Sequence, residues 1–323
     1  MTALLALAAL VAAGWWWLDR PLPLRASPLD LSIEPGTLPR GVAQAVKDAG
    51  VDVNPDLLFL WFRLSQQARL IKAGSYELET GVTPRRLLSK LARGEESLRA
   101  LTLVEGWNWR QVRAALNREE MLKHDTANLA DEDVMKLLGR PGVHPEGRFF
   151  PDTYTYSKGS SDVKVLQRAM RAMDNRLAEA WAQRRPDSVA KSADEALILA
   201  SIVEKETGRA ADRTLISSVF NNRLKIGMPL QTDPTVIYGL GASFNGNLRK
   251  IDLQTDTPWN TYTRPGLPPT PISMPGKASL LAAVQPAAGK NLYFVAKGDG
   301  ASQFSENLDE HNRAVNKYQR GQR

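Results

Sequence analysis

Hydrophobic positions follow a helical period over most of the chain, and short stretches with alternating apolar and polar residues separate them. The longest apolar faces at helical spacing lie in residues 55–73 and 162–183. Alternation predicts strands in residues 30–35, 74–81 and 98–106, and a hairpin over a glycine turn in 291–305. Further helices are predicted at 39–49 (closed by Gly50), 84–93, 107–117, 193–207 and 307–318. This mixture predicts an α+β fold.

Residues 74–105 form a compact strand–helix–strand unit in this prediction. Thr83 fits the N-cap of its helix, Pro84 the first helical position and Gly94 the stop. The unit resembles half of a small carbohydrate-binding module of the LysM kind. We therefore expect three parts: an anchor over residues 1–20, an N-terminal region over 28–142 that includes the LysM-like α/β subdomain, and a mixed α+β domain over 143–323.

The first residues predict an attachment to a membrane. Residues 2–18, TALLALAALVAAGWWWL, carry no charge. A stretch of this length is about the shortest that can span a membrane as a helix. Trp15 to Trp17 stand at one end, where indole rings favour the water interface. We predict a retained transmembrane anchor rather than a cleaved signal peptide, whose apolar region is shorter. Charge leaves the orientation open, because no Lys or Arg precedes the segment and Arg20 follows it.

Composition narrows the classes of function. The 323 residues include no cysteine, which excludes a disulfide framework and a thiol nucleophile. The histidines His124, His144 and His311 are scattered without ligand spacing, so no metal site and no cofactor is predicted. The net charge of +7 suits an anionic partner such as a membrane surface or a carboxylate-bearing polymer. Nucleic acid has only this charge in its favour, and the predicted anchor argues against it.

The segment LASIVEKETG, residues 199–208, places two glutamates in an otherwise apolar helix. A capping box at residues 192–195 sets the start of this helix, and Gly208 is its expected stop. The helix is apolar nearly all round and is therefore expected to be buried. Each carboxylate then needs a partner, a cleft or a proton.

Helical geometry separates the two glutamates. Glu204 shares a face with the small residues Ala200 and Ser201, whereas Glu206 points to the opposite side. Small neighbours leave room for a ligand to approach Glu204, and a glutamate at the apolar floor of a cleft has the raised pKa that a general acid needs. A structural ion pair with a nearby arginine, such as Arg223 for Glu206, is the alternative.

Three further segments have the composition of loops that line a groove. Residues 145–156, PEGRFFPDTYTY, are rich in aromatics and prolines. Gln231 and Thr232 precede Asp233, which is explained as the N-cap of a helix with proline at its first position. The long segment 256–276 combines hydroxyls, amides and aromatic rings, the groups that a sugar-binding groove requires.

These motifs resemble a known family. ILASIVEKET, FNNRLKIGMPLQTDPTVIYG, NTYTRPGLPPTPI and LYFVA occur in this order, and GSYEL, VEGW and EGRFFPDTY precede them. Together they resemble the MltG (YceG-like) endolytic murein transglycosylases over about residues 32–318. The resemblance implies an inner-membrane, single-pass protein whose catalytic domain faces the periplasm. It also implies peptidoglycan glycan strands as substrate, with peptidoglycan synthases or elongation and division proteins as candidate partners.

The resemblance also implies a chemistry for the first glutamate. Glu204 matches the catalytic residue, which acts as acid and then as base while the sugar's own 6-hydroxyl closes onto C1. The product is a 1,6-anhydro-MurNAc end, and such cleavage is expected to terminate or trim nascent strands. Glu206, Arg223, Asn222 and Asp233 are expected to support the site. The expected substrate contacts are Gln231, Thr232, Tyr238, Asn260, Thr261 and Tyr262.

Two other functions stay open at the level of sequence. A non-catalytic protein could bind peptidoglycan or act as a division scaffold through the LysM-like unit. A hydrolytic muramidase would need a second carboxylate to activate water. Glu146 and Asp152 are the candidates for that second carboxylate, although Glu146 is more simply explained as a residue that holds its own loop together.

Overall fold

The computed structural model describes residues 2–206 and 209–321, and the chain divides into two compact units. The first unit comprises the residues up to 100 together with 121–123 and 155–160. The second comprises residues 101–120, 124–154 and 161 onward. This division differs from the predicted boundary at residue 142, because most of residues 101–142 belong to the second unit.

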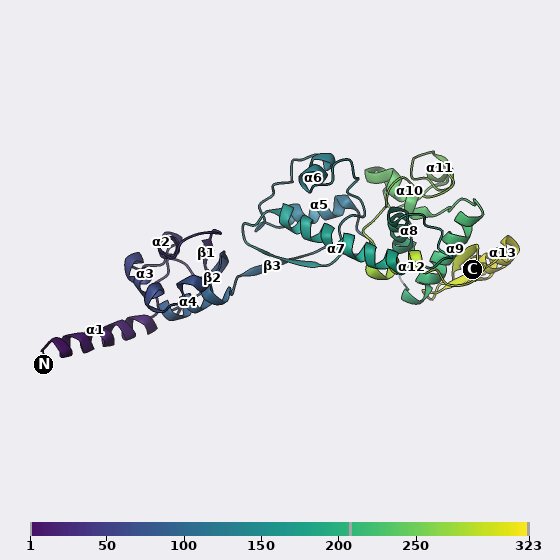
Figure 1. Cartoon of the computed structure of the whole chain (residues 1–323). Helices are drawn as coiled ribbons and strands as arrows, with labels where there is room; N and C mark the ends of the chain where they lie inside the picture. Colours follow the sequence, from purple (N-terminus) through teal and green to yellow (C-terminus); the bar gives the residue numbers. More distant parts are fainter. Residues whose placement is uncertain (1, 207–208, 322–323) are drawn as a thin grey trace. The chain divides into compact units, whose positions relative to one another are not determined.

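The first unit holds a small antiparallel strand pair covered by helices (Figure 1). Its elements are α1 (Thr2–Asp19), β1 (Leu29–Ile33), α2 (Pro39–Ala49), α3 (Pro55–Leu64), a 3₁₀ turn at Ala68–Leu70, β2 (Gly74–Leu78) and α4 (Pro84–Arg93). In the register of β1 and β2, Leu31 pairs with Tyr76, and both side chains are buried. Alternate residues of each strand thus face the apolar core under α2, α3 and α4.

The capping signals of this unit are confirmed. The Thr83 side chain accepts a hydrogen bond from the Arg86 backbone N–H, and Gly94 ends α4 in the left-handed region. The helix predicted over residues 55–73 is too long. It ends at Leu64, because the Ser65 hydroxyl bonds to the Phe62 carbonyl at 2.8 Å and Gln66 turns to a φ of 58°. The chain then continues through the 3₁₀ turn to β2.

The predicted anchor segment is helical. Helix α1 covers Thr2–Asp19, and Leu5, Val11, Trp15 and Trp16 are exposed on it. Across residues 2–206 and 209–321, no helix combines the length and the hydropathy required to cross a membrane.

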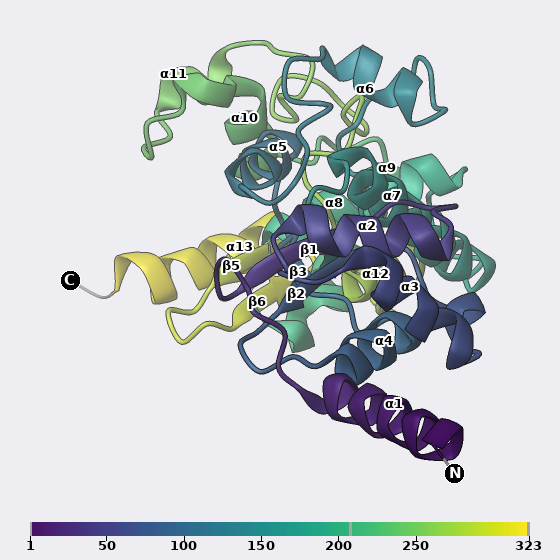
Figure 2. The same ribbon diagram turned by 90° about the vertical axis from the view of Figure 1, so that its left-hand side faces the viewer.

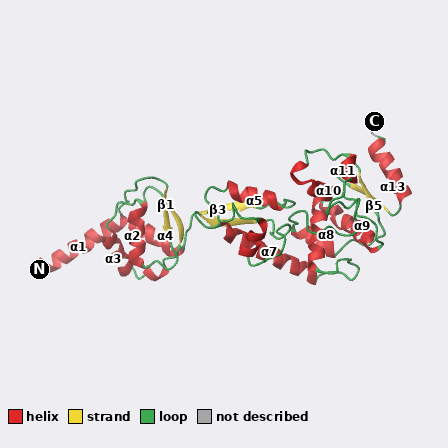
Figure 3. Cartoon of the chain, turned by 90° about the horizontal axis from the view of Figure 1, so that it is seen from above, coloured by secondary structure: helices red, strands yellow, loops and turns green. Residues whose placement is uncertain are grey.

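The second unit is mainly helical (Figure 3). Its elements are α5 (Trp109–Arg118), α6 (Asp131–Leu137), α7 (Asp162–Ala182), α8 (Ala193–Glu206), α9 (Arg213–Lys225), α10 (Asp233–Leu240), α11 (Lys250–Gln254), α12 (Lys277–Val284), β5 (Tyr293–Ala296), β6 (Ser302–Ser305) and α13 (Leu308–Val315). Strands β5 and β6 form the predicted hairpin. Strand β3 (Leu98–Thr102) pairs with β4 (Thr153–Ser157), and each of these strands contributes residues to both units.

Helix α8 is the central element of the second unit. It packs against α7, α9 and α12, which lie around it in two perpendicular views (Figures 1 and 2). Its side chains from Ala196 to Val203, except Ile198, are buried, and all of these except Ser201 belong to one apolar cluster. Burial on several sides confirms the prediction drawn from its near-continuous apolar sequence and fixes the orientation of the glutamates at its C-terminal end.

Residues 145–156 are not the groove-lining loop that their composition predicts. Phe149, Phe150, Tyr154 and Tyr156 are buried, and the last part of the segment is β4. The Phe149 ring stacks on Trp109 with a centroid distance of 4.9 Å. Pro151 separates the adjacent rings of Phe149 and Phe150 from β4, and the alternation of side chains along β4 turns Tyr154 and Tyr156 to the same buried side.

Truncation of a buried side chain of α8 tests whether this helix is part of the packed core of the second unit. Leu197→Ala removes a fully buried side chain and leaves a cavity, so we expect the free energy of unfolding to fall by about 2–5 kcal/mol. The matched control is Leu137→Ala on α6, whose side chain is exposed and should cost much less. Chemical unfolding followed by circular dichroism measures both. Equal losses would show that α8 is not part of the tightly packed interior.

Candidate active site

The position of α8 is set at its start by a cap. The Ser192 hydroxyl accepts a hydrogen bond from the Glu195 backbone N–H at 3.1 Å, and the Glu195 carboxylate accepts one from the Lys191 backbone N–H at 2.7 Å. The predicted capping signal is therefore present. At the other end α8 runs to Glu206, and the expected stop at Thr207 and Gly208 lies outside the described residues.

Glu206 faces a cavity of about 400 Å³. The cavity is lined by residues of α8, α9, α10, the hairpin and α13: Glu206, Arg223, Leu230, Gln231, Asp233, Tyr262, Tyr293, Phe294, Leu308 and His311. It combines one buried cation, carboxylates and two aromatic phenols with apolar walls. A hollow with a few convergent polar groups has the general features of a ligand-binding site.

The pKa of the Glu206 carboxyl is raised above its usual range. Burial is the largest cause, and the nearby charge of Asp233 acts in the same direction. A hydrogen bond from the Thr232 hydroxyl and the positive charge of Arg223 lower the pKa and offset part of the effect. Glu206 thus holds a proton to a higher pH than an exposed glutamate does.

Arg223 forms a fixed wall of the cavity. Its Nε donates to the Leu292 carbonyl and its Nη1 to the Leu230 carbonyl, both at 2.7 Å, and its guanidinium lies 5.2 Å from the centre of the Tyr293 ring. These bonds hold the charge near Glu206 at low conformational cost. Arg223, which the sequence predicts as a supporting residue, therefore lies beside Glu206 in the lining of the cavity. Asn222 donates instead to the carbonyls of Gly289 and Asn291 and braces the chain before the hairpin.

Asp233 and Gln231 line the cavity near the start of α10, and their local structure differs from the sequence prediction. Asp233 is not the N-cap, because Thr232 holds that position and Asp233 is already helical. The Asp233 carboxylate instead accepts a 2.6 Å hydrogen bond from the Tyr262 hydroxyl, and burial together with this bond raises the pKa of that phenol. The preceding Gln231 has a φ of 49°, in the left-handed region that non-glycine residues rarely adopt, which is typical of functional sites.

Glu204 lies in a different environment. Its carboxylate accepts a hydrogen bond from the Gly276 backbone N–H at 2.9 Å. The room expected beside its small neighbours is filled by chain, because the Ser201 hydroxyl accepts from the Ile272 N–H at 3.0 Å and the Ser201 carbonyl accepts from the Ser273 hydroxyl at 3.1 Å. Burial is the main cause of a raised pKa at Glu105, and the nearby charge of Glu204 raises this pKa further.

Four of the predicted substrate contacts do not line the cavity: Thr232, Asn260 and Thr261 are buried, and Tyr238 is half-buried. Asn260 is fully buried, and its amide donates to the carbonyls of Leu253 and Thr255 at 3.0 and 2.7 Å. The Thr261 hydroxyl accepts from the Thr232 N–H at 3.1 Å. Tyr238 packs edge-on against Trp259 with a centroid distance of 5.4 Å. These residues position the loop around the cavity, whereas Gln231 and Tyr262 line it directly.

The carboxylates considered for a hydrolytic mechanism lie elsewhere. Glu146 is buried, and both its oxygens lie 3.0 Å from the Trp109 backbone N–H at the start of α5. It therefore holds its loop, as the sequence suggests. Burial raises its pKa to about 7, against hydrogen bonds from Trp109 and Tyr238 that lower it. Asp152 is exposed and accepts from the Thr153 N–H at 2.7 Å.

The hairpin and α13 contribute cavity residues that the sequence analysis does not select. Tyr293 and Phe294 belong to the LYFVA motif, and His311 stacks on Tyr293 at 5.1 Å. The quoted motif itself is the signal that could have pointed to them. Within the described ranges, no group of three or more His, Cys, Asp or Glu residues is placed to hold a metal ion.

Comparison with known proteins decides the family. The sequence model of the YceG-like family matches residues 31–317, nearly the full described chain. The chain belongs to the YceG-like family. It is 33% identical over 308 residues to the endolytic murein transglycosylase of Bacillus subtilis, covering 90% of this chain and 84% of that protein. It is 28% identical to the endolytic murein transglycosylase of Streptococcus pneumoniae D39, covering 95% of this chain and 63% of that protein.

A solved structure extends the comparison. The crystal structure of a YceG-like protein from Listeria monocytogenes aligns with this YceG-like chain at a TM-score of 0.56 and 30% sequence identity. The alignment covers 88% of this chain and 98% of the other. The likeness in fold thus extends over both units.

The buried Glu146 gives this YceG-like protein a pH-dependent stability. Its folded pKa of about 7 exceeds the unfolded value of 4.5, so the folded state binds the proton more tightly and loses stability as pH rises between these values. The loss is on the order of 3 kcal/mol. We expect Glu146→Gln to flatten this decline in urea unfolding between pH 4.5 and 8, and Glu132→Gln, an exposed change on α6, to leave it in place. An unchanged decline in Glu146→Gln would contradict the assignment.

Proposed function

We propose that this protein is a lytic transglycosylase that cuts the β-1,4 bond between MurNAc and GlcNAc within peptidoglycan strands and leaves 1,6-anhydro-MurNAc ends. The names of its relatives in Bacillus and Streptococcus support the substrate and the endolytic reaction. The observation that carries the proposal for this chain is a carboxyl group of raised pKa facing a polar and aromatic cavity.

We assign the acid and base role to Glu206 rather than to Glu204, the residue that the family resemblance implies. A general acid needs a pKa raised toward neutrality and access to the glycosidic oxygen. Glu206 has the raised pKa and lines the cavity. Glu204 is bonded to the Gly276 backbone, and the chain from Ile272 to Gly276 covers the neighbouring face of α8.

The proposed reaction needs only this one carboxyl. Protonated Glu206 donates its proton to the glycosidic oxygen as the bond from that oxygen to C1 breaks. The oxygen of the 6-hydroxyl then forms a bond to C1, and the Glu206 carboxylate takes up the proton that the hydroxyl loses. Water does not enter the product. The Asp233 carboxylate is engaged by Tyr262, which makes it a positioning group and not a base for a hydrolytic water.

We also propose where the protein works. Helix α1 would attach the chain to the inner membrane, with the second unit in the periplasm beside newly made strands. The cut would then terminate or trim nascent strands next to peptidoglycan synthases or elongation and division proteins. The apolar N-terminal sequence and the implied substrate are the observations behind this proposal.

The direct test uses the full-length chain in detergent with purified peptidoglycan, and mass spectrometry of the released fragments. We expect anhydro-muramyl ends from the native chain. Glu206→Gln keeps the size and hydrogen bonds of the side chain but cannot transfer the proton, so turnover should fall by at least about 100-fold. Glu204→Gln, on the same helix, is the matched control and should retain most of the activity.

Other products would point elsewhere. Loss of activity in Glu204→Gln with activity kept in Glu206→Gln would return the role to Glu204. Reducing muramic ends would show that water is the acceptor and the protein a muramidase. Binding without any product, from a folded native chain, would favour a peptidoglycan-binding or scaffold protein.

Thr232 should tune the pH range of the reaction. The acid must be protonated, so activity falls as pH rises through the pKa of Glu206. The Thr232 hydroxyl bond lowers that pKa, and its removal in Thr232→Val should therefore move the basic limb of the pH–rate profile to higher pH. Initial rates across pH 4–9 measure this shift.

The control for Thr232→Val is Thr235, a buried threonine within α10. Thr235 donates to the Thr232 carbonyl at 2.7 Å and lies 2.9 Å from the Thr261 hydroxyl, so Thr235→Val also removes a buried hydroxyl. It should not displace the limb. A displacement of equal size in both variants, or in neither, would mean that the limb does not report the bond between Thr232 and Glu206.

A further inference from the structure

Helix α3 carries two apolar faces. Leu58 and Phe62 face the core of the first unit and are fully buried. On another side Leu57, Leu60 and Leu64 follow the helical spacing i, i+3, i+7 and are 42%, 50% and 71% exposed. A soluble helix normally presents polar residues on its outer side. The outer stripe is therefore unexplained by the core that α3 helps to form.

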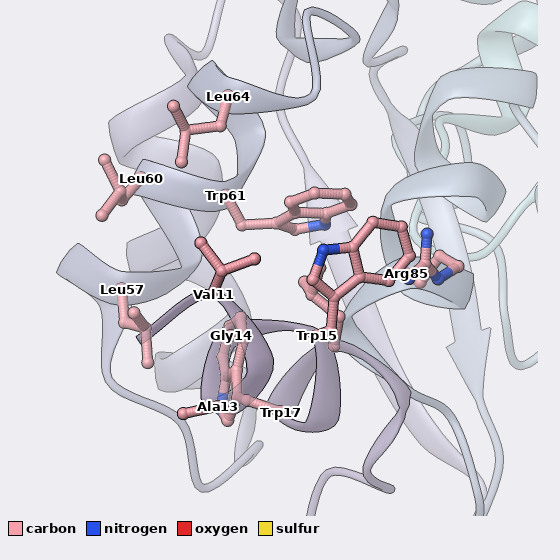
Figure 4. A pocket seen from close by; sticks show the side chains of 11 residues that line it. Val11, Ala13, Gly14, Trp15, Trp17, Leu57, Leu60, Trp61, Leu64 and Arg85 are labelled. Atoms are coloured by element: carbon pink, nitrogen blue, oxygen red, sulfur yellow. The ribbon is translucent and has the colours of Figure 1, made fainter. Parts of the chain in front are cut away.

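The stripe continues onto α1. Together the two helices enclose an apolar hollow of about 690 Å³, whose lining includes Val11, Trp15 and Trp17 from α1 and Leu57, Leu60, Trp61 and Leu64 from α3. Figure 4 shows Val11 of α1 beside the leucines of α3, and Trp15 of α1 between Trp61 and Arg85. The exposed apolar surface of the N-terminal helix is thus continuous with that of α3.

Arginines border this apolar surface. Arg85 lies 5.0 Å from the centre of the Trp15 ring and 5.9 Å from that of Trp61, and its Nε donates to Asp19 at 2.9 Å. Arg20 lies 4.8 Å from the centre of the Trp16 ring. Exposed indoles and leucines next to guanidinium groups match the boundary between acyl chains and anionic headgroups.

We propose that the outer face of α3 lies in a membrane surface, with acyl chains of anionic phospholipids filling the hollow between α1 and α3 and arginines at headgroup level. A bilayer supplies both parts of this chemistry along one boundary, whereas an ordinary soluble partner would have to match indoles, leucines and guanidinium groups individually. The first unit is then held against the lipid by two helices rather than tethered by α1 alone. The inference is independent of the catalytic role of Glu206.

The chain is well suited to a direct test because it contains no cysteine. Leu60→Cys and Leu64→Cys place single thiols on the outer face of α3, where both side chains are exposed. Glu95→Cys is the control, an exposed position just beyond α4 at the end remote from Arg85. Each full-length variant is labelled with a nitroxide and reconstituted into vesicles of phosphatidylcholine with phosphatidylglycerol. Circular dichroism verifies the fold before labelling.

Accessibility to oxygen, which partitions into lipid, is compared with accessibility to a water-soluble nickel chelate. We expect the labels at positions 60 and 64 to favour oxygen and to report a depth of roughly 5–10 Å, and the label at position 95 to favour nickel. Nickel access at 60 and 64 equal to that at 95 would overturn the proposal while leaving α1 free to attach the chain. Protection from both reagents would also overturn it, and spin–spin broadening relieved by unlabelled protein would identify a second copy as the occupant.

Discussion

The placement of one carboxylate at the edge of an apolar core is the constraint on which the site depends. Helix α8 is buried on several sides, so Glu206 emerges from its C-terminal end with little solvent around it. The charged form is costly there, and two groups lower that cost: the hydroxyl of Thr232 in the loop before α10, and the cation of Arg223 on α9. Neither partner cancels the effect of burial, so the pKa of the Glu206 carboxyl stays above its usual range.

The rest of the second unit serves this arrangement. Asn260 ties its loop together through backbone carbonyls, and that loop in turn holds Gln231 and Thr232 in place through Thr261. The strained backbone of Gln231 is sustained by these bonds. Residues predicted as substrate contacts thus act mainly one layer behind the cavity, where amides and hydroxyls satisfy each other.

Much of the secondary structure could be predicted from local signals. Thr83 and Gly94 delimit α4, and the capping signal at Ser192 marks the start of α8, because these residues act through bonds within one helical turn. The α+β class follows from the same signals. The end of α3 depends on the left-handed backbone of Gln66, and a glutamine does not predict such a conformation. The burial of the aromatic residues in 145–156 depends on distant partners such as Trp109. Composition alone does not reveal these partners, and the prediction of a groove-lining loop was therefore wrong.

The candidate site shows the same limit. The sequence predicts the helix and both glutamates, whereas our proposal of Glu206 over Glu204 rests on the side of α8 that the distant segment 272–276 covers. The spacing of residues on a helix predicts the side on which each side chain lies, but it does not predict which other segment packs against that side. The hairpin residues of the cavity are likewise distant in sequence, and only the folded chain brings them to Glu206.

A crystal structure of the Glu206→Gln variant with a bound glycan tetrasaccharide would test the central claim most directly. The account predicts that the amide at position 206 lies within hydrogen-bond reach, roughly 2.6–3.2 Å, of the glycosidic oxygen, with the sugar against Tyr262 and Gln231. A glycosidic oxygen positioned instead beside Glu204, with the cavity at Glu206 free of sugar, would contradict it.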